Sequence, residues 1–127
     1  EHGSYRDMAR LADRTPGFQS NAAGMSHSEY WYLKLRTGDW PMAQMLKTLR
    51  YRPAVLEGDP RRGGRIFVWP WMATLTPDEM TPSAIREVDA LLGEGQGDAM
   101  RRGGLWQGYM LGVSEDGVWR FFVSGAG

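Results

Sequence analysis

The two histidines of the sequence, His2 and His27, are its only side chains whose ordinary pKa lies near neutral pH. A serine lies on each side of His27, and serine with histidine is the pair that many acyl-transfer enzymes use as nucleophile and base. Neighbours in sequence do not share that geometry, however, and the chain lacks the G-x-S-x-G motif. We therefore interpret residues 26–29, Ser-His-Ser-Glu, as a helix start and predict no catalytic residue.

Metal and cofactor chemistry also finds little support in the sequence. The chain has no cysteine, which excludes disulfides, thiolate nucleophiles and cysteine-based zinc sites. The H-E-x-x-H motif is absent, and Glu115 and Asp116 belong to a turn. The glycine-rich residues 93–97 lack the Lys-Ser/Thr of a phosphate-binding loop and are interpreted as a linker between helices. We predict no metal and no cofactor.

Aromatic side chains are the most unusual feature of the composition. The chain has six Trp, five Tyr and four Phe, or 12% of its residues. Trp and Tyr combine a flat apolar face with a polar group, which suits stacking on sugar rings, peptides or partner proteins. We predict an aromatic-lined groove formed by Trp69, Trp71, Trp106 and Tyr109. Trp69 and Trp71 would face the same side if their strand continued past Pro70.

Three arginines form a basic cluster that we place at the rim of this groove: Arg61, Arg62 and Arg65. One interpretation is a binding site for an anion or an acidic partner. The alternative, which we favour, is an exposed turn whose arginines pair with the acidic segment from Asp78 to Asp98.

The length and charge of the chain restrict its class. Its 127 residues fit one α+β domain over residues 1–127, and 42% hydrophobic with 24% charged residues is an ordinary globular composition. Fifteen basic and fifteen acidic residues give a net charge of zero, so we expect no nucleic-acid partner. No apolar run is long enough for a transmembrane segment. Because the chain begins with Glu1, we expect a periplasmic or secreted protein if a signal was removed, and a cytoplasmic one otherwise.

Capping residues predict several helices in the first half of the chain. Helices are expected to begin at Ser4, at Ser26 and at Asp39. In the third, the spacing of the apolar residues predicts a buried face made of Met42, Met45, Leu46 and Leu49. Residues 50–65, rich in Pro, Gly and Arg, are typical of a short strand followed by an exposed turn.

The second half combines strands with helix starts. Residues 65–69 predict a strand that ends before Pro70, and Thr76-Pro77 and Thr81-Pro82 are typical helix starts. We expect the helix over 81–92 to pack on one face of the sheet. Its expected inner face is Ile85, Val88, Leu91 and Leu92.

The end of the chain predicts a β-hairpin. Residues 105–113 and 118–123 flank Ser-Glu-Asp-Gly, and Asp-Gly is a strong hairpin turn. Alternation in the second strand should place Trp119 and Phe122 on opposite faces. We therefore predict an α+β fold in which N-terminal helices pack on a small antiparallel sheet that ends with this hairpin.

The C-terminal half resembles a family of uncharacterised bacterial proteins, mostly proteobacterial. The resemblance is carried by Phe-Val-Trp-Pro-Trp at 67–71, Gly-Tyr-Met-Leu-Gly-Val at 108–113 and Asp-Gly-Val-Trp-Arg-Phe-Phe-Val-Ser-Gly at 116–125. It implies a small α+β domain and export from the cytoplasm, and it supplies no catalytic residues.

We predict a non-enzymatic binding or interaction domain of the bacterial envelope, with a glycan, a peptide or a protein as its ligand. One alternative is a small hydrolase built around His27 with an acidic partner. A solvent-exposed His27 with no carboxylate or hydroxyl converging on it would exclude this alternative. Another alternative is a subunit of a larger assembly, in which the exposed aromatic residues form a flat patch. The sequence leaves the ligand and the oligomeric state open.

Overall fold

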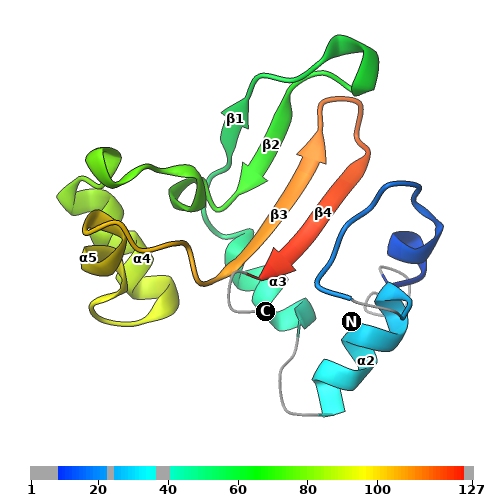
Figure 1. The fold of residues 1–127 in the computed structure, drawn as a ribbon, viewed down its shortest axis with the longest axis horizontal. Coiled ribbons are helices and arrows are strands. Elements are labelled where there is room, and N and C mark those ends of the chain that lie inside the picture. The colour runs from blue at the N-terminus through cyan, green and yellow to red at the C-terminus, as the bar shows by residue number, and fades with distance from the viewer. Residues whose placement is uncertain (1–8, 23–24, 37–40, 125–127) are drawn as a thin grey trace.

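The computed structural model describes residues 9–22, 25–36 and 41–124 and has an α+β fold (Figure 1). This confirms the predicted fold class. Four antiparallel strands form one sheet in the order β1-β2-β3-β4. Their bounds are β1 (Ala54–Leu56), β2 (Ile66–Trp69), β3 (Tyr109–Ser114) and β4 (Trp119–Ser124).

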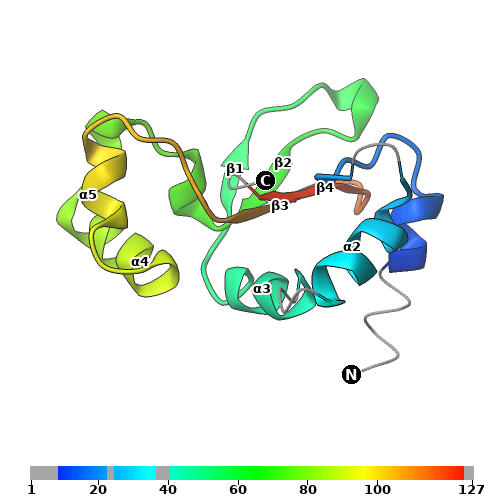
Figure 2. The ribbon, with the colours of Figure 1, turned by 60° about the horizontal axis from the view of Figure 1, so that its bottom comes forward.

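Helices α2 (His27–Arg36) and α3 (Pro41–Thr48) lie on one face of the sheet (Figure 2). Residues 9–14, which precede them, are also helical. Helix α2 begins with the predicted capping box, because Ser26 Oγ accepts from the Glu29 N–H (3.1 Å) and Glu29 Oε1 accepts from the Ser26 N–H (3.2 Å). The expected caps Ser4 and Asp39 lie outside the described residues.

The buried face of α3 differs from the predicted one. Pro41, Met45 and Thr48 are buried, whereas Leu46 is 53% exposed and Leu49 is 41% exposed. The side chain of Met42 lies outside the description. The stripe at i, i+4 and i+7 therefore includes the polar Thr48, whose hydroxyl donates to the Gln44 carbonyl (2.8 Å) within the helix.

The C-terminal helices form a second group beyond one end of the sheet (Figures 1 and 2). It comprises the 3₁₀ turns η2 (Trp71–Thr74) and η3 (Pro77–Glu79) and the helices α4 (Pro82–Leu92) and α5 (Gln96–Arg101). As predicted, Thr81 caps α4, with its hydroxyl oxygen accepting from the Ala84 N–H (3.2 Å). The expectation that α4 packs on a sheet face is wrong, because its buried residues Ala84 and Val88 pack in a separate cluster with residues of the neighbouring segments: Met72, Met80, Met100 and Trp106.

The predicted hairpin is present, but a register shift at Gly112 and Val113 changes which faces its side chains occupy. Leu111 pairs with Phe122, whereas Val113 pairs with Trp119. The shift places Trp119 and Phe122 in the same buried cluster, so the predicted alternation is wrong. Trp119 lies next to the ring of Phe18, with 4.3 Å between ring centroids.

A short segment before α2 covers the outer edge of β4. The Gln19 N–H donates to the Arg120 carbonyl (3.1 Å), and the Phe122 N–H donates to the Gln19 carbonyl (3.0 Å). Asn21 continues the contact through both of its side-chain amide atoms to the backbone of Ser124. One edge of the sheet is therefore protected, while β1 forms the opposite edge.

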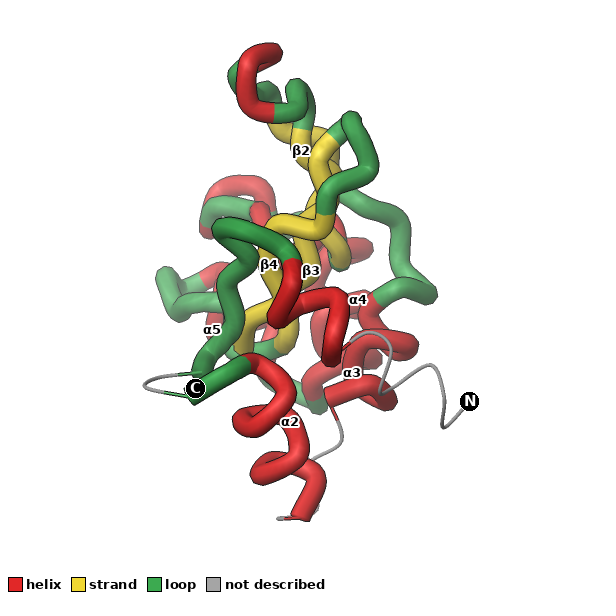
Figure 3. Tube along the Cα trace, turned by 90° about the vertical axis from the view of Figure 1, so that its right-hand side faces the viewer, coloured by secondary structure: helices red, strands yellow, loops and turns green. Residues whose placement is uncertain are grey.

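The β1–β2 connection carries the 3₁₀ turn η1 (Pro60–Arg62) and projects at one end of the molecule (Figures 1 and 3). Among the described residues, no helix has the length and apolar character needed to cross a membrane.

Helices α4 and α5 approach each other closely at Gly97. A Cβ at this position would lie 2.7 Å from both the Cα and the carbonyl oxygen of Ile85, which are backbone atoms that cannot move aside locally. We expect Gly97→Ala to destabilise the protein by about 1–3 kcal/mol, even though alanine favours helices. Urea unfolding measures the effect, with Ser83→Ala in the exposed first turn of α4 as the matched control. A Gly97→Ala variant as stable as the wild type would contradict this close packing.

Candidate functional site

The structure separates the predicted aromatic groove residues into two environments. Trp69 ends β2 and packs against the sheet's buried cluster. Trp71 opens η2 and packs in the second cluster, where its indole N–H donates to Glu87 Oε1 (3.0 Å). The guanidinium of Arg52 lies over the Trp71 ring, 4.2 Å from its centroid. Trp69 and Trp71 were expected to face the same side only if their strand continued past Pro70. Strand β2 ends at Trp69, so this expectation does not apply.

Trp106 belongs to the second cluster, as Trp71 does, and it also contacts Tyr109 at the start of β3. The buried Trp106 donates its indole N–H to the Tyr109 carbonyl (3.1 Å). The Tyr109 ring is stacked on Phe122, with 4.9 Å between centroids and 22° between planes. Gly108 lies between them, and a Cβ there would be 2.8 Å from the Trp106 ring. This packing fixes the backbone that carries Tyr109.

A pocket of about 310 Å³ opens beside Tyr109. It lies where α3, the C-terminal end of α4, the start of β3 and the end of β4 meet. Its volume is at the lower end of the range for ligand sites, roughly 300–1,000 Å³. Its lining consists of Gln44, Thr48, Leu91, Leu92, Gln107, Gly108, Tyr109 and Ser124.

The lining of this pocket is neutral and mixed in polarity. The lining includes the amide-bearing residues Gln44 and Gln107 and the hydroxyl-bearing residues Thr48 and Ser124. None of the described lining residues is Asp, Glu, His, Lys or Arg. Gln107 Nε2 donates to the Leu105 carbonyl (3.3 Å), which orients its amide. Such groups offer donors and acceptors for hydroxyls and amides of a ligand, and they offer no partner for a charged one.

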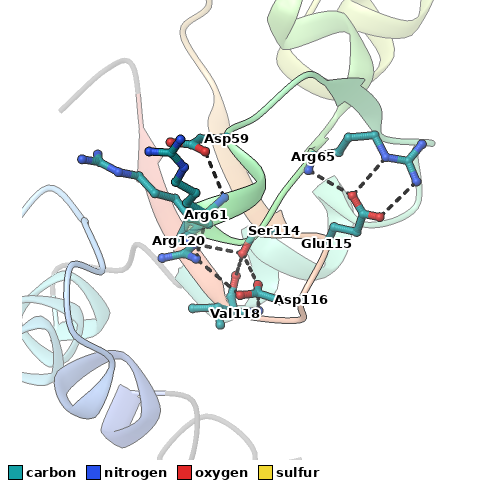
Figure 4. Close-up of polar contacts among 9 residues, drawn as sticks. Asp59, Arg61, Arg65, Ser114, Glu115, Asp116, Val118 and Arg120 are labelled. Atoms are coloured by element: carbon teal, nitrogen blue, oxygen red, sulfur yellow. Dashed lines mark hydrogen bonds and ion pairs between the residues drawn. The ribbon is translucent and has the colours of Figure 1, made fainter.

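The arginines lie at the other end of β3, around the hairpin turn (Figure 4). Arg65 Nε lies 3.1 Å from Glu115 Oε1, and the hydrogen bond from Arg65 keeps the pKa of Glu115 below its ordinary value. The acidic partner of Arg65 is therefore in the hairpin turn and not between Asp78 and Asp98. The contact joins the β1–β2 turn to the β3–β4 turn.

A second set of contacts strengthens this joint. Arg120 donates to Ser114 Oγ (2.9 Å) and to the Arg62 carbonyl (2.9 Å). The Ser114 hydroxyl donates to Asp116 Oδ1 (2.5 Å), and this hydrogen bond holds the pKa of Asp116 below its ordinary value.

Arg61 and Arg62 remain exposed on η1. The turn is capped by Asp59, whose Oδ1 accepts from the Arg61 N–H (2.9 Å). Within the described part of the chain, neither guanidinium has an ion-pair partner. Neither arginine is among the residues that line the pocket at Tyr109.

His27 has both a hydroxyl and a carboxylate close by. Ser20 Oγ lies 2.5 Å from His27 Nδ1, and Asp13 Oδ1 accepts from the His27 backbone N–H (2.8 Å). Burial acts to raise the pKa of Asp13, but hydrogen bonds, first that from the Ser28 hydroxyl, lower it overall. Because the Asp13 carboxylate accepts hydrogen bonds from the His27 and Ser28 backbone N–H groups at the start of α2 and from the Ser28 hydroxyl, it acts as a helix cap. The condition that would exclude the His27 alternative is not met, so the alternative stays a prediction.

No cluster of three or more His, Asp or Glu side chains that could hold a metal ion occurs among the described residues. Comparisons with protein-family models, curated proteins and solved structures find no match to this chain.

Of the residues that the sequence analysis assigned to the groove, Tyr109 lines the pocket, and the other lining residues were not predicted. Gln44 and Thr48 are four residues apart on α3, beside the buried Met45, and polar residues on the inner stripe of a helix are a signal for a polar site. Gln107 and Ser124 carry no such signal, because Ser124 reaches the pocket only through its pairing with Tyr109, two residues after Gln107.

The network at the hairpin turn predicts a specific pH dependence. Because folding lowers the pKa of Asp116 below 3.8, this carboxylate stabilises the fold above that pH, and its contribution is lost as the pH falls through the lowered value. We expect Asp116→Asn to be less stable than the wild type at about pH 6 and the difference to shrink towards about pH 3. Urea unfolding at both pH values measures it, with the exposed Asp78→Asn as control. A difference independent of pH would contradict the role of the carboxylate charge.

Proposed function

We propose that the protein is a non-enzymatic binding domain whose pocket at Tyr109 holds a small, neutral ligand rich in hydroxyl and amide groups. An N-acetylated sugar ring is the ligand class that we favour. Such a ligand would suit a domain of the bacterial envelope, where glycans are exposed.

The single observation that carries this proposal is the neutral, amide- and hydroxyl-bearing lining of the pocket. A sugar presents hydroxyls that donate and accept, and an N-acetyl group presents one amide. Gln44 and Gln107 can each match these groups in both directions, because a side-chain amide donates and accepts. Leu91 and Leu92 supply the apolar part of the wall, against which the carbon–hydrogen face of a sugar or an acetyl methyl can pack.

The arrangement around the pocket favours binding over chemistry. Tyr109 is the only described lining residue with a titratable side chain, and its ring is fixed by stacking on Phe122. Trp106 lies close to the lining residue Gly108, since a Cβ at Gly108 would be 2.8 Å from its ring, so we expect Trp106 fluorescence to report on the pocket.

We expect an N-acetylglucosamine disaccharide to bind to the wild type and Gln44→Ala to weaken this binding about fivefold, the effect of one lost hydrogen bond. Isothermal titration calorimetry measures the affinity, and Trp fluorescence should change on binding. Gln96→Ala on α5, a half-buried glutamine outside the pocket, is the matched control and should bind as the wild type does.

Two further results would decide against this ligand class. A negatively charged sugar acid should bind more weakly than the neutral disaccharide, because the described lining residues offer it no counter-charge. Equal binding of both sugars, or binding that Gln44→Ala leaves unchanged, would place the ligand elsewhere.

A second candidate function is the small hydrolase, and the Ser20–His27 contact is the observation that favours it. In such an enzyme the Ser20 oxygen would attack an acyl carbon while His27 Nδ1 takes the hydroxyl proton and passes it to the leaving alcohol or amine, whose bond to the acyl carbon breaks. Water, giving a proton to His27, would then attack the same carbon, and the Ser20 oxygen would leave with that proton as the free carboxylic acid is released. Ser20 Oγ also accepts from the Ala22 N–H (3.1 Å), which is a local turn contact and gives a structural reason for the same geometry.

A fluorophosphonate probe, which labels activated serines, separates the two candidates. If the protein is a binding domain, we expect intact-mass spectrometry to detect no adduct on the wild type. An adduct at Ser20 that disappears in His27→Gln, with circular dichroism unchanged, would favour the hydrolase. The Ser20→Ala variant controls for labelling at other serines.

A further inference from the structure

Helices α2 and α3 share one inner side and one outer side. Trp31 of α2 and Met45 of α3 pack in the same buried cluster as Leu111 and Phe122 of the sheet. The opposite sides of both helices therefore face away from the sheet, in the helical layer that Figure 2 shows beneath it. We call the exposed residues of this side the outer helical face: Leu33, Arg36, Leu46, Lys47, Leu49 and Arg50.

The apolar part of the outer helical face consists of three leucines. Leu33 is 41% exposed, Leu46 is 53% exposed and Leu49 is 41% exposed. The Leu49 N–H still donates to the Met45 carbonyl (2.9 Å), so Leu46 and Leu49, three residues apart, are neighbours on one helical turn. A group of exposed leucines on one side of a helical layer indicates an interaction surface.

A basic residue accompanies each leucine of this face: Arg36 follows Leu33 by three residues, and Lys47 and Arg50 directly follow Leu46 and Leu49. All three basic residues are exposed, and none of them takes part in an ion pair within the described part of the chain. Their charges are therefore available to a partner.

The rest of the helical layer is also basic. From residue 9 to residue 50, the described residues include six basic side chains and two carboxylates, Asp13 and Glu29. Both carboxylates accept hydrogen bonds at the N-terminus of α2. The chain as a whole has no net charge, so this excess of four positive charges is a local property of the layer.

We propose that the outer helical face binds the surface of an anionic lipid bilayer. The leucines would enter the boundary between headgroups and acyl chains, and the guanidinium and ammonium groups would reach the lipid phosphates. Leucine beside lysine and arginine on a helix face is typical of interfacial membrane contacts. Attraction to anionic lipid strengthens such binding about fivefold for each basic side chain near the surface.

Two other occupants fit this face less well. At protein interfaces lysine is depleted, and leucine is under-represented among the residues that contribute most of the binding energy. A second copy that used the same face would bring two positive surfaces together, and like charges repel. None of the six residues of the face lines the pocket at Tyr109, so this proposal and the proposed function can fail independently.

The test measures binding of the full chain to large unilamellar vesicles. One set contains equal parts of phosphatidylglycerol and phosphatidylcholine, and the other contains phosphatidylcholine alone. We expect co-sedimentation to show saturable binding to the anionic vesicles, which high salt weakens, and binding at least about tenfold weaker to the neutral ones. Soluble glycerol phosphate in excess should not displace the protein, because it lacks the acyl chains that the leucines contact.

The charge variant is Lys47→Glu with Arg50→Glu, which should weaken binding to the anionic vesicles at least about 25-fold, because two attractive charges are lost. The matched control is Arg61→Glu with Arg62→Glu on η1, which lies on the other side of the sheet (Figure 2). It makes the same change in net charge and should leave the affinity within about twofold of the wild type.

The apolar variant is Leu46→Gln with Leu49→Gln, which keeps every charge of the face. It should weaken binding at least about tenfold, because glutamine does not enter the acyl boundary as leucine does. Circular dichroism checks that each variant retains the fold.

Three outcomes would overturn the proposal. The first is the absence of saturable binding to the anionic vesicles. The second is equal weakening by the charge variant and its η1 control, or unchanged binding of the apolar variant, either of which is a response to charge without contact at this face. The third is a different occupant: complete displacement by glycerol phosphate indicates a free anion, equally strong binding to soluble poly-glutamate indicates an acidic protein, and self-association without vesicles that the charge variant abolishes indicates a second copy.

Discussion

The pairing of β3 with β4 is the constraint on which the rest of the structure depends. Strand β2 pairs with the free side of β3, and the segment at Gln19 pairs with the free side of β4. The turn of the hairpin holds the β1–β2 turn through Glu115 and Arg120. The register shift within the pair gathers Trp119 and Phe122 into one core beneath α2. Elements from both halves of the chain are therefore positioned by its last two strands.

The same hairpin separates two surfaces with different chemistry. At the start of β3, Trp106 and Phe122 fix Tyr109 beside a neutral pocket. At the other end, the ion pairs and hydrogen bonds of the turn hold η1, where Arg61 and Arg62 remain exposed. A rigid hairpin suits this division, because a site gains precision when its residues are held by regular elements. The hairpin therefore holds the neutral pocket at one end and the exposed arginines of η1 at the other.

Local signals predicted the elements well, and nonlocal pairing explains what they missed. The capping boxes, the strand before Pro70 and the Asp-Gly hairpin turn depend on neighbouring residues, and each is present. The predicted inner face of α3 was wrong because the polar Thr48 is buried beside the pocket where the apolar Leu49, one residue later, was expected. The faces of β4 were wrong because a register shift is a property of two strands together. The pocket itself joins residues from four elements, which no single segment of sequence encodes.

The most direct test of the central claim is a titration of the ¹⁵N-labelled protein with the N-acetylglucosamine disaccharide, followed by ¹H–¹⁵N correlation spectra. The side-chain amides of Gln44 and Gln107 report on the pocket individually, and backbone amides report on every other surface. We predict that these two side-chain amides and the backbone amides of Tyr109 and Ser124 shift together along one saturable curve. An unchanged spectrum, or shifts that spare these four residues, would contradict a ligand site at Tyr109.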